Sequence, residues 1–167
     1  SVTFINYGSV INQTGTTVNV AAANYLGQGN TLLGNVTATN LTVTRSAGAV
    51  TQSSGSNLTI AANSNITAGT INLTASNNTL GTQSISLNVT AGDLINARDL
   101  NAGCITLVAS GNLSNLANVT ADNTVTIKGS NVSNAGNISA TANAMLTATA
   151  GTVTNNATIS AANTSVT

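Results

Sequence analysis

A repeat of about twenty residues is the feature that most constrains the fold of this chain. Three segments can be laid over one another: SGNLSNLANVTAD at 110–122, KGSNVSNAGNISA at 128–140 and TAGTVTNNATISA at 149–161. A partial match, TAGDLINARDLNA at 90–102, precedes them. A repeat of this length predicts a solenoid, because each unit is one supersecondary element that buries its apolar face against the neighbouring units.

Two aliphatic anchors recur in each unit and define the period. The first set is Leu94, Leu113, Val132 and Val153, at steps of 19, 19 and 21 residues, and the second is Leu100, Val119, Ile138 and Ile159, at the same steps. Most units also carry a pair of alternating aliphatic residues, such as Ile105 and Leu107. Short period-2 runs of this kind predict three β-strands per unit, and the dense leucine pattern of a leucine-rich repeat is missing.

Stacked units of three strands predict an all-β fold, a parallel β-helix in which each strand pairs with its counterparts about 4.8 Å above and below. Parallel crossovers are almost always right-handed, so we expect the right-handed form. The 167 residues make about eight coils of roughly 20 residues. We interpret 1–167 as a single β-helix segment, with regular repeats at 84–163 and less regular coils with loop insertions at 1–83. Both ends resemble interrupted coils, which indicates a fragment of a longer shaft.

The N-terminal half shows a second self-similarity. GNVTATNLTV at 34–43 resembles SNITAGTINLTA at 64–75, thirty residues later, which we interpret as one coil plus an insertion. The insertion is expected in one of two loop-like segments, 46–56 or 76–84, where Arg45, Gln52 and Gln83 would be available for binding. Tyr7 and Tyr25 are expected at corners of the coils.

Composition argues against several functions. Charged residues make up 4% and aromatic residues 2% of the chain, the net charge is zero and histidine is absent. A nucleic-acid interface needs a basic face and stacking aromatics, so no nucleic-acid partner is expected. No apolar run approaches the ~18 residues of a membrane span, and no cofactor or metal is expected. The lone Cys104 cannot form an internal disulfide and is interpreted as a small turn residue rather than a reactive thiol.

Four asparagines are candidates for a structural ladder: Asn96, Asn115, Asn134 and Asn155. Each lies two residues after an anchor, so period-2 geometry turns its side chain inward. Equivalent positions in successive coils are one strand spacing apart, which predicts amide-to-amide hydrogen bonds along the stack. The alternative is that each asparagine bonds to the backbone of its own corner.

Asparagine is also abundant in Asn-x-Ser/Thr triplets, which are candidate glycosylation sites. They include Asn35, Asn40, Asn57, Asn65, Asn72, Asn88, Asn112, Asn118, Asn131 and Asn137. A coil favours the same triplet without any modification, because a corner Asn, an inward aliphatic residue and an outward Thr satisfy its geometry.

Two further functions can be tested against the sequence. Several polysaccharide-degrading enzymes are β-helices, but only Asp93, Arg98 and Asp99 cluster here, and the repeat alignment places these acids where Asn112 and Asn118 stand in the next unit. We therefore expect no enzyme. An ice-binding solenoid is the stronger alternative. It would use an outward row at Thr42, Thr59, Ser86, Thr106 and Thr126, beside a mixed row at Asn40, Asn57, Ser84, Cys104 and Thr124.

The units GDLINARDLNAG, SGNLSNLANVTAD and SNVSNAGNISA resemble the repeats of filamentous-haemagglutinin-type exoproteins, the adhesins that Gram-negative bacteria export by two-partner secretion. The resemblance covers 84–163 well and the remainder loosely. It implies a secreted, cell-surface virulence protein with an outer-membrane secretion partner and a host-cell or bacterial receptor or glycan as ligand. The family's secretion domain contains Asn-Pro-Asn motifs, whereas this chain has no proline, which fits an interior piece of the shaft. The function expected is that of a non-catalytic shaft segment of an adhesin, with binding by loops or ribbon faces.

Overall fold

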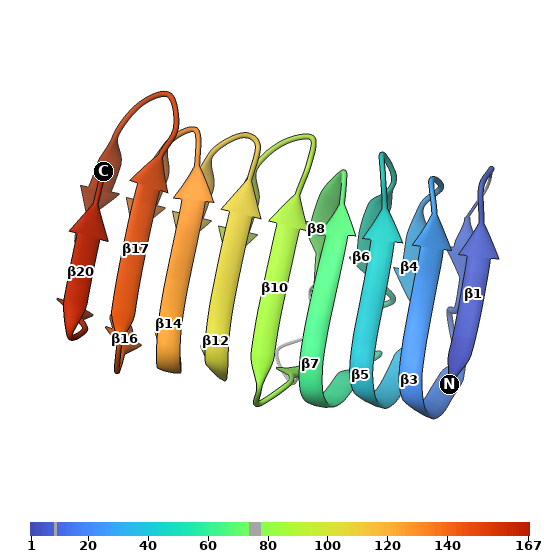
Figure 1. Cartoon of the computed structure of the whole chain (residues 1–167). Coiled ribbons are helices and arrows are strands. Elements are labelled where there is room, and N and C mark those ends of the chain that lie inside the picture. The colour runs from blue at the N-terminus through green and yellow to red at the C-terminus, as the bar shows by residue number, and fades with distance from the viewer. Residues whose placement is uncertain (9, 74–77) are drawn as a thin grey trace.

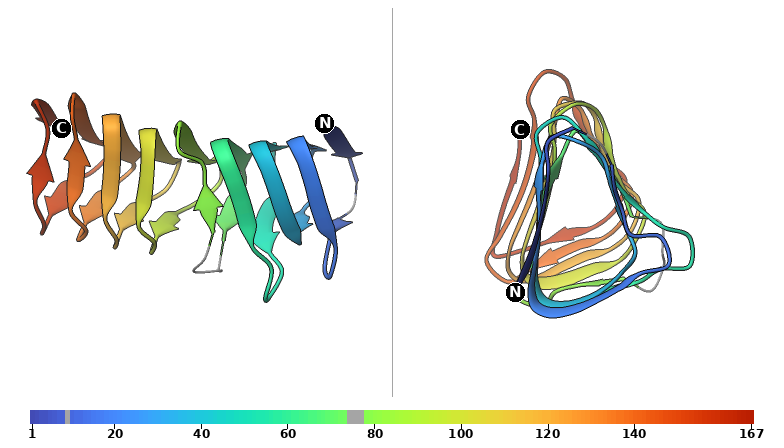
Figure 2. Two further views of the ribbon diagram at one scale, coloured as in Figure 1. Left: turned by 90° about the horizontal axis from the view of Figure 1, so that it is seen from below. Right: turned by 90° about the vertical axis from the view of Figure 1, so that its right-hand side faces the viewer.

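The computed structural model of the chain describes residues 1–8, 10–73 and 78–167. In these ranges the regular secondary structure is β-strand throughout, wound into about eight coils of roughly 20 residues. The coils advance along one axis with a right-handed twist and enclose a three-sided interior (Figures 1 and 2). The predicted right-handed parallel β-helix is therefore confirmed. No helix in the described ranges could cross a membrane.

Each coil has three faces, which we number 1 to 3 in the order in which the chain passes through them, beginning with β1 (Val2–Asn6). Face 1 carries short strands and the second halves of long, bent strands. Its short strands are β1 (Val2–Asn6), β10 (Ser84–Val89), β17 (Asn143–Ala148) and β20 (Asn163–Val166). The long strands are β3 (Thr17–Gly27), β5 (Asn35–Arg45), β7 (Leu58–Ala68), β12 (Leu100–Ala109) and β14 (Val119–Gly129). All pairs are parallel.

Face 2 follows in each coil and consists of two separate sheets. The first sheet contains β2 (Ile11–Asn12), β4 (Thr31–Leu33), β6 (Ala49–Gln52) and β8 (Thr70–Asn72). The second contains β11 (Leu94–Asn96), β13 (Leu113–Asn115), β15 (Val132–Asn134) and β18 (Val153–Asn155). Face 3 closes the coil with the first halves of the long strands and with β9 (Thr79–Leu80), β16 (Ile138–Ala140) and β19 (Ile159–Ser160).

The aliphatic anchors lie in the stacked positions that their spacing predicts. On face 2, Leu94 pairs with Leu113, Leu113 with Val132 and Val132 with Val153. On face 3 the same holds for the column Leu100, Val119, Ile138 and Ile159. All are buried except Val153 and Ile159, which are half-buried in the last coil. The interior is thus a set of aliphatic columns, in which each side chain is shielded from water by the equivalent side chains of the neighbouring coils.

The thirty-residue similarity in the N-terminal half is not the coil register, and this interpretation was wrong. Val36 pairs with Leu58, and Thr42 pairs with Asn65, so 34–43 and 64–75 do not occupy equivalent positions. Paired residues of β5 and β7 are 22 apart up to Ala38 and 23 apart from Asn40 on, because a β-irregularity lies between these two residues. Backbone hydrogen bonds between strands fix the register of the coils, whereas sequence similarity between two segments of a low-complexity chain does not.

The expected insertion at 46–56 is also only partly correct. Strand β6 runs through this segment as a regular rung of face 2, and the additional residues are confined to the turn 53–57. The second expected insertion, 76–84, begins outside the described residues at 76–77 and then contains β9 and the first residue of β10.

A pair of substitutions at adjacent positions tests the inward register. Val132 is 1% exposed, so Val132→Asp places a carboxylate in the aliphatic interior and should cost several kcal/mol of unfolding free energy. Asn131 is exposed; Asn131→Asp retains the bond in which Oδ1 accepts the N–H of Thr152 and loses only the solvent-exposed bond from Nδ2 to Asn112 Oδ1. Thermal unfolding should show a large loss of melting temperature for Val132→Asp and a small one for Asn131→Asp. Equal losses would reject the register.

Candidate functional site

An asparagine ladder runs along the inside of face 2 in the C-terminal half. The amide of Asn96 donates to Asn115 Oδ1, that of Asn115 to Asn134 and that of Asn134 to Asn155, each at 2.7 Å. Asn115 also donates to the Ala117 carbonyl at 2.8 Å, and Asn134 and Asn155 make the same bond two residues on. The ladder and the corner bonds, which the sequence presents as alternatives, occur together because a carboxamide has two N–H groups.

The turns on either side of this ladder also form hydrogen bonds between coils, through polar side chains on the outside of the solenoid. Asp93 Oδ1 accepts the N–H of Asn112 at 2.6 Å, and Asp99 Oδ1 accepts that of Asn118 at 2.9 Å. In the next coil Asn118 Oδ1 accepts the N–H of Asn137 at 3.1 Å. The two acids therefore replace asparagine as turn acceptors, and they form bonds between coils.

The candidate glycosylation sites differ in exposure. Among the ten, Asn35, Asn40 and Asn88 are half-buried and the other seven are exposed. Glycosylation modifies Nδ2, and Asn131 Nδ2 donates to Asn112 Oδ1 at 2.9 Å, which makes this site a poor acceptor. Modification of the exposed sites stays a prediction.

The outward hydroxyl row expected for an ice-binding surface is interrupted. Thr42 pairs with Asn65 on face 1, and Thr59 lies on face 3, where it pairs with Thr37. Placing Thr59 in one row with Thr42 was wrong, because strand β7 bends and its two halves belong to different faces.

Cys104 was expected to be a small turn residue, and this prediction was wrong. It lies within strand β12 on face 1, half-buried, with Ser84 and Thr124 as its neighbours in the adjacent coils.

Arg45 is buried in the interior of the N-terminal half rather than presented by a loop. Its Nε donates to Thr31 Oγ1 at 2.6 Å, and its Nη1 donates to the carbonyls of Leu26 and Asn6 at 2.7 and 3.1 Å. Gly27 leaves the space that the guanidinium fills, because a Cβ there would lie 2.7 Å from Nη1. The prediction of a binding role failed because Arg45 continues the inward alternation of its strand, although arginine is rarely buried.

Tyr25 is likewise inside and not at a corner. Its ring stacks on Phe4 with centroids 4.9 Å apart, and its hydroxyl donates to Gln13 Oε1 at 2.8 Å. Burial raises the pKa of the Tyr25 phenol to about 12. Gln52 is buried too and donates to the Ser56 carbonyl, so of the three expected binding residues Gln83 alone is exposed.

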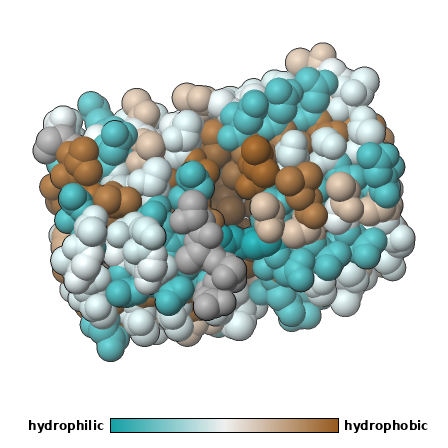
Figure 3. Space-filling view, turned by 180° about the vertical axis from the view of Figure 1, so that it is seen from behind, coloured by the Kyte–Doolittle hydropathy of each residue, from teal (hydrophilic) through white to brown (hydrophobic). Residues whose placement is uncertain are grey.

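The most distinctive surface feature lies where the two halves meet. Strand β8 does not pair with β11, and β9 pairs with β7 but not with β12, so consecutive coils are joined there through β10 on face 1. We call the two interrupted positions the seam. Turn length accounts for it on face 2: Gly69 alone separates β7 from β8, whereas 90–93 separate β10 from β11. Figure 3 shows an apolar hollow in the middle of the molecule, seen from behind.

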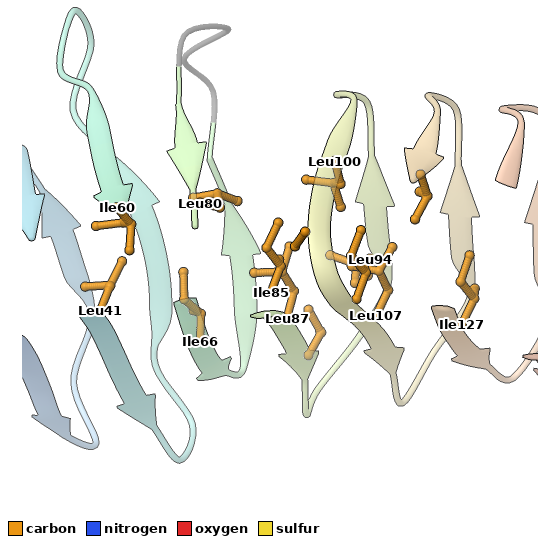
Figure 4. Packing of buried hydrophobic residues seen from close by; sticks show 14 of the residues in the cluster. Leu41, Ile60, Ile66, Leu80, Ile85, Leu87, Leu94, Leu100, Leu107 and Ile127 are labelled. Carbon is orange, nitrogen blue, oxygen red and sulfur yellow. The ribbon is translucent and has the colours of Figure 1, made fainter. Parts of the chain in front are cut away.

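Two cavities open at the seam and share Leu80. The first, on face 2, has a volume of about 570 Å³ and an aliphatic wall that includes Leu87 and Leu94. Figure 4 shows the labelled side chains of Leu80, Leu87 and Leu94 directed into the interior between the strands. The second, on face 3, has a volume of about 510 Å³ and includes Asp99 and Asp122 in its wall.

The face-3 cavity is the better candidate for a polar ligand. Besides the two acids, its wall contains Asn78, Asn101 and Thr79. Amides, hydroxyls and carboxylates of this kind form hydrogen bonds with sugar hydroxyls. No group of three or more metal-ligating side chains occurs among the described residues. No sequence motif marks the seam, because strand pairing between coils can stop without any characteristic residue pattern.

Comparison of the chain with protein-family models, with curated proteins and with solved structures gave no match.

The asparagine ladder predicts that substitutions of two neighbouring asparagines have non-additive effects on the free energy of unfolding, which a double-mutant cycle can measure. Asn134→Leu removes a partner from both Asn115 and Asn155, which should cost roughly 1–3 kcal/mol at the buried Asn115 amide and less at the exposed Asn155. Asn115→Leu in the same chain should add much less than its own single loss, because the bond between the two amides is already gone. The cycle is completed by measuring the free energy of unfolding in urea for the original chain, the two single variants and the double variant. Simple additivity would show that the amides act independently.

Proposed function

We propose that this chain is a non-catalytic shaft segment of a secreted bacterial surface adhesin. The observation that carries the proposal is the use of polar side chains for bonds between coils, as in the ladder from Asn96 to Asn155 and the turn acceptors Asp93 and Asp99. Side chains used in this way join each coil to the next and stiffen a rod, which is the role of a shaft. The resemblance of 84–163 to adhesin repeats supports export by an outer-membrane partner.

We assign binding of a surface glycan to the polar face-3 cavity of the seam. Asn101 and Asp122 line it on the C-terminal side, and Asn78 and Thr79 line it on the other. Such a ligand would contact both halves of the solenoid mainly through hydrogen bonds, since none of the described residues that line the cavity is aromatic.

A glycan array followed by product analysis tests both parts of the proposal. We expect saturable binding of a bacterial or host-cell glycan, weakened by Asn101→Ala, with no cleavage of the bound glycan. Asp99→Asn tests for catalysis, because it removes the carboxylate while the new amide keeps the acceptor for the Asn118 N–H, as Asn118 does for Asn137. Glycan cleavage that Asp99→Asn abolishes would overturn the non-catalytic shaft. Absence of binding to every glycan and cell type would overturn the adhesive role.

A further inference from the structure

The aliphatic cavity on face 2 of the seam has the dimensions of a ligand site. Its volume is about 570 Å³, within the range of small-molecule pockets, which are mostly apolar with few polar groups. Leu80, Leu87 and Leu94 are buried in its wall, and Ile71 and Leu73 are half-buried there. All of these side chains belong to described residues on both sides of the seam.

Arg98 brings a positive charge to this aliphatic wall. Its Nη2 donates to the Leu73 carbonyl on the far side of the seam, so the side chain spans the interruption between the halves. Its Nη1 is buried and has no hydrogen-bond partner among the described residues. Burial lowers the pKa of Arg98, and no carboxylate contributes to that shift, although Asp93 also lines the cavity. Asp93 instead accepts the N–H of Asn112 through Oδ1.

A cation without a counter-charge beside an apolar cavity defines the complementary ligand. The leucine and isoleucine side chains, which make up most of the wall beside Asn72, Asp93 and Asn96, favour an alkyl chain. A planar guanidinium matches a carboxylate in geometry as well as in charge. We propose that this cavity binds one medium-chain alkyl carboxylate, with the carboxylate at the Arg98 guanidinium and the alkyl chain along the aliphatic part of the wall, where Ile71 and Leu73 are half-buried.

Equilibrium dialysis of sodium decanoate against the whole chain, below its micelle concentration, tests the proposal. We expect one decanoate per chain and a Kd at least about tenfold lower than that of 1-decanol, because the alcohol leaves Arg98 without a counter-ion. Octanoate should bind about tenfold more weakly than decanoate, because it buries two fewer methylene groups. Equal binding of decanoate and 1-decanol, or no binding of decanoate, would overturn the proposal.

Charge variants locate the binding. Arg98→Gln should weaken decanoate binding at least about tenfold and leave 1-decanol binding unchanged, whereas Arg98→Lys should restore part of the decanoate affinity. Lys128→Gln is the matched control, because it removes an exposed cation from face 1. Cooperative thermal unfolding of Arg98→Gln shows that the variant is folded. An unchanged decanoate affinity in Arg98→Gln, or an equal loss in Lys128→Gln, would contradict the site. The proposal does not depend on glycan binding at face 3.

Discussion

Hydrogen bonding between the backbones of consecutive coils is the constraint on which the rest of this structure depends. Parallel strands about 4.8 Å apart place each residue directly on its counterpart one coil away, so the side chains form columns. Leu94, Leu113 and Val132 form one such column, and the ladder asparagines form another two residues on. Any change at one position is therefore felt by the equivalent positions in both neighbouring coils.

The seam is the place where this constraint is relaxed. Face 1 continues through β7, β10 and β12, whereas on face 2 β8 does not pair with β11 and on face 3 β9 does not pair with β12. Arg98 takes the place of a backbone donor at the Leu73 carbonyl. In the next coils the equivalent carbonyls of Asn96 and Asn115 accept the N–H groups of Leu116 and Ala135. Loss of pairing thus produces the two cavities described here and leaves a cation without a counter-charge.

Sequence reasoning succeeded where the repeats are nearly identical and failed where they are not. The spacing of Leu100, Val119 and Ile138 sets both the coil length and the inward direction, so the fold and the columns at 84–163 follow from it. In the N-terminal half, Arg45 and Tyr25 are inward because of their strand position, and residue type alone predicts the opposite. The seam escaped prediction because it depends on turn geometry, which composition does not specify.

Amide hydrogen exchange resolved by NMR tests most directly whether coil-to-coil bonding stops at the seam. The Leu94 N–H donates to the Asn112 carbonyl, and successive residues of a strand direct their backbone groups to opposite edges, so the Ile95 N–H points into the seam. Ser114 and Ser133 hold the same register in coils that are paired on both sides. We predict rapid exchange at Ile95 and slow exchange at Leu94, Ser114 and Ser133. Equal protection of Ile95 and Ser114 would show that face 2 is continuous and would contradict the seam.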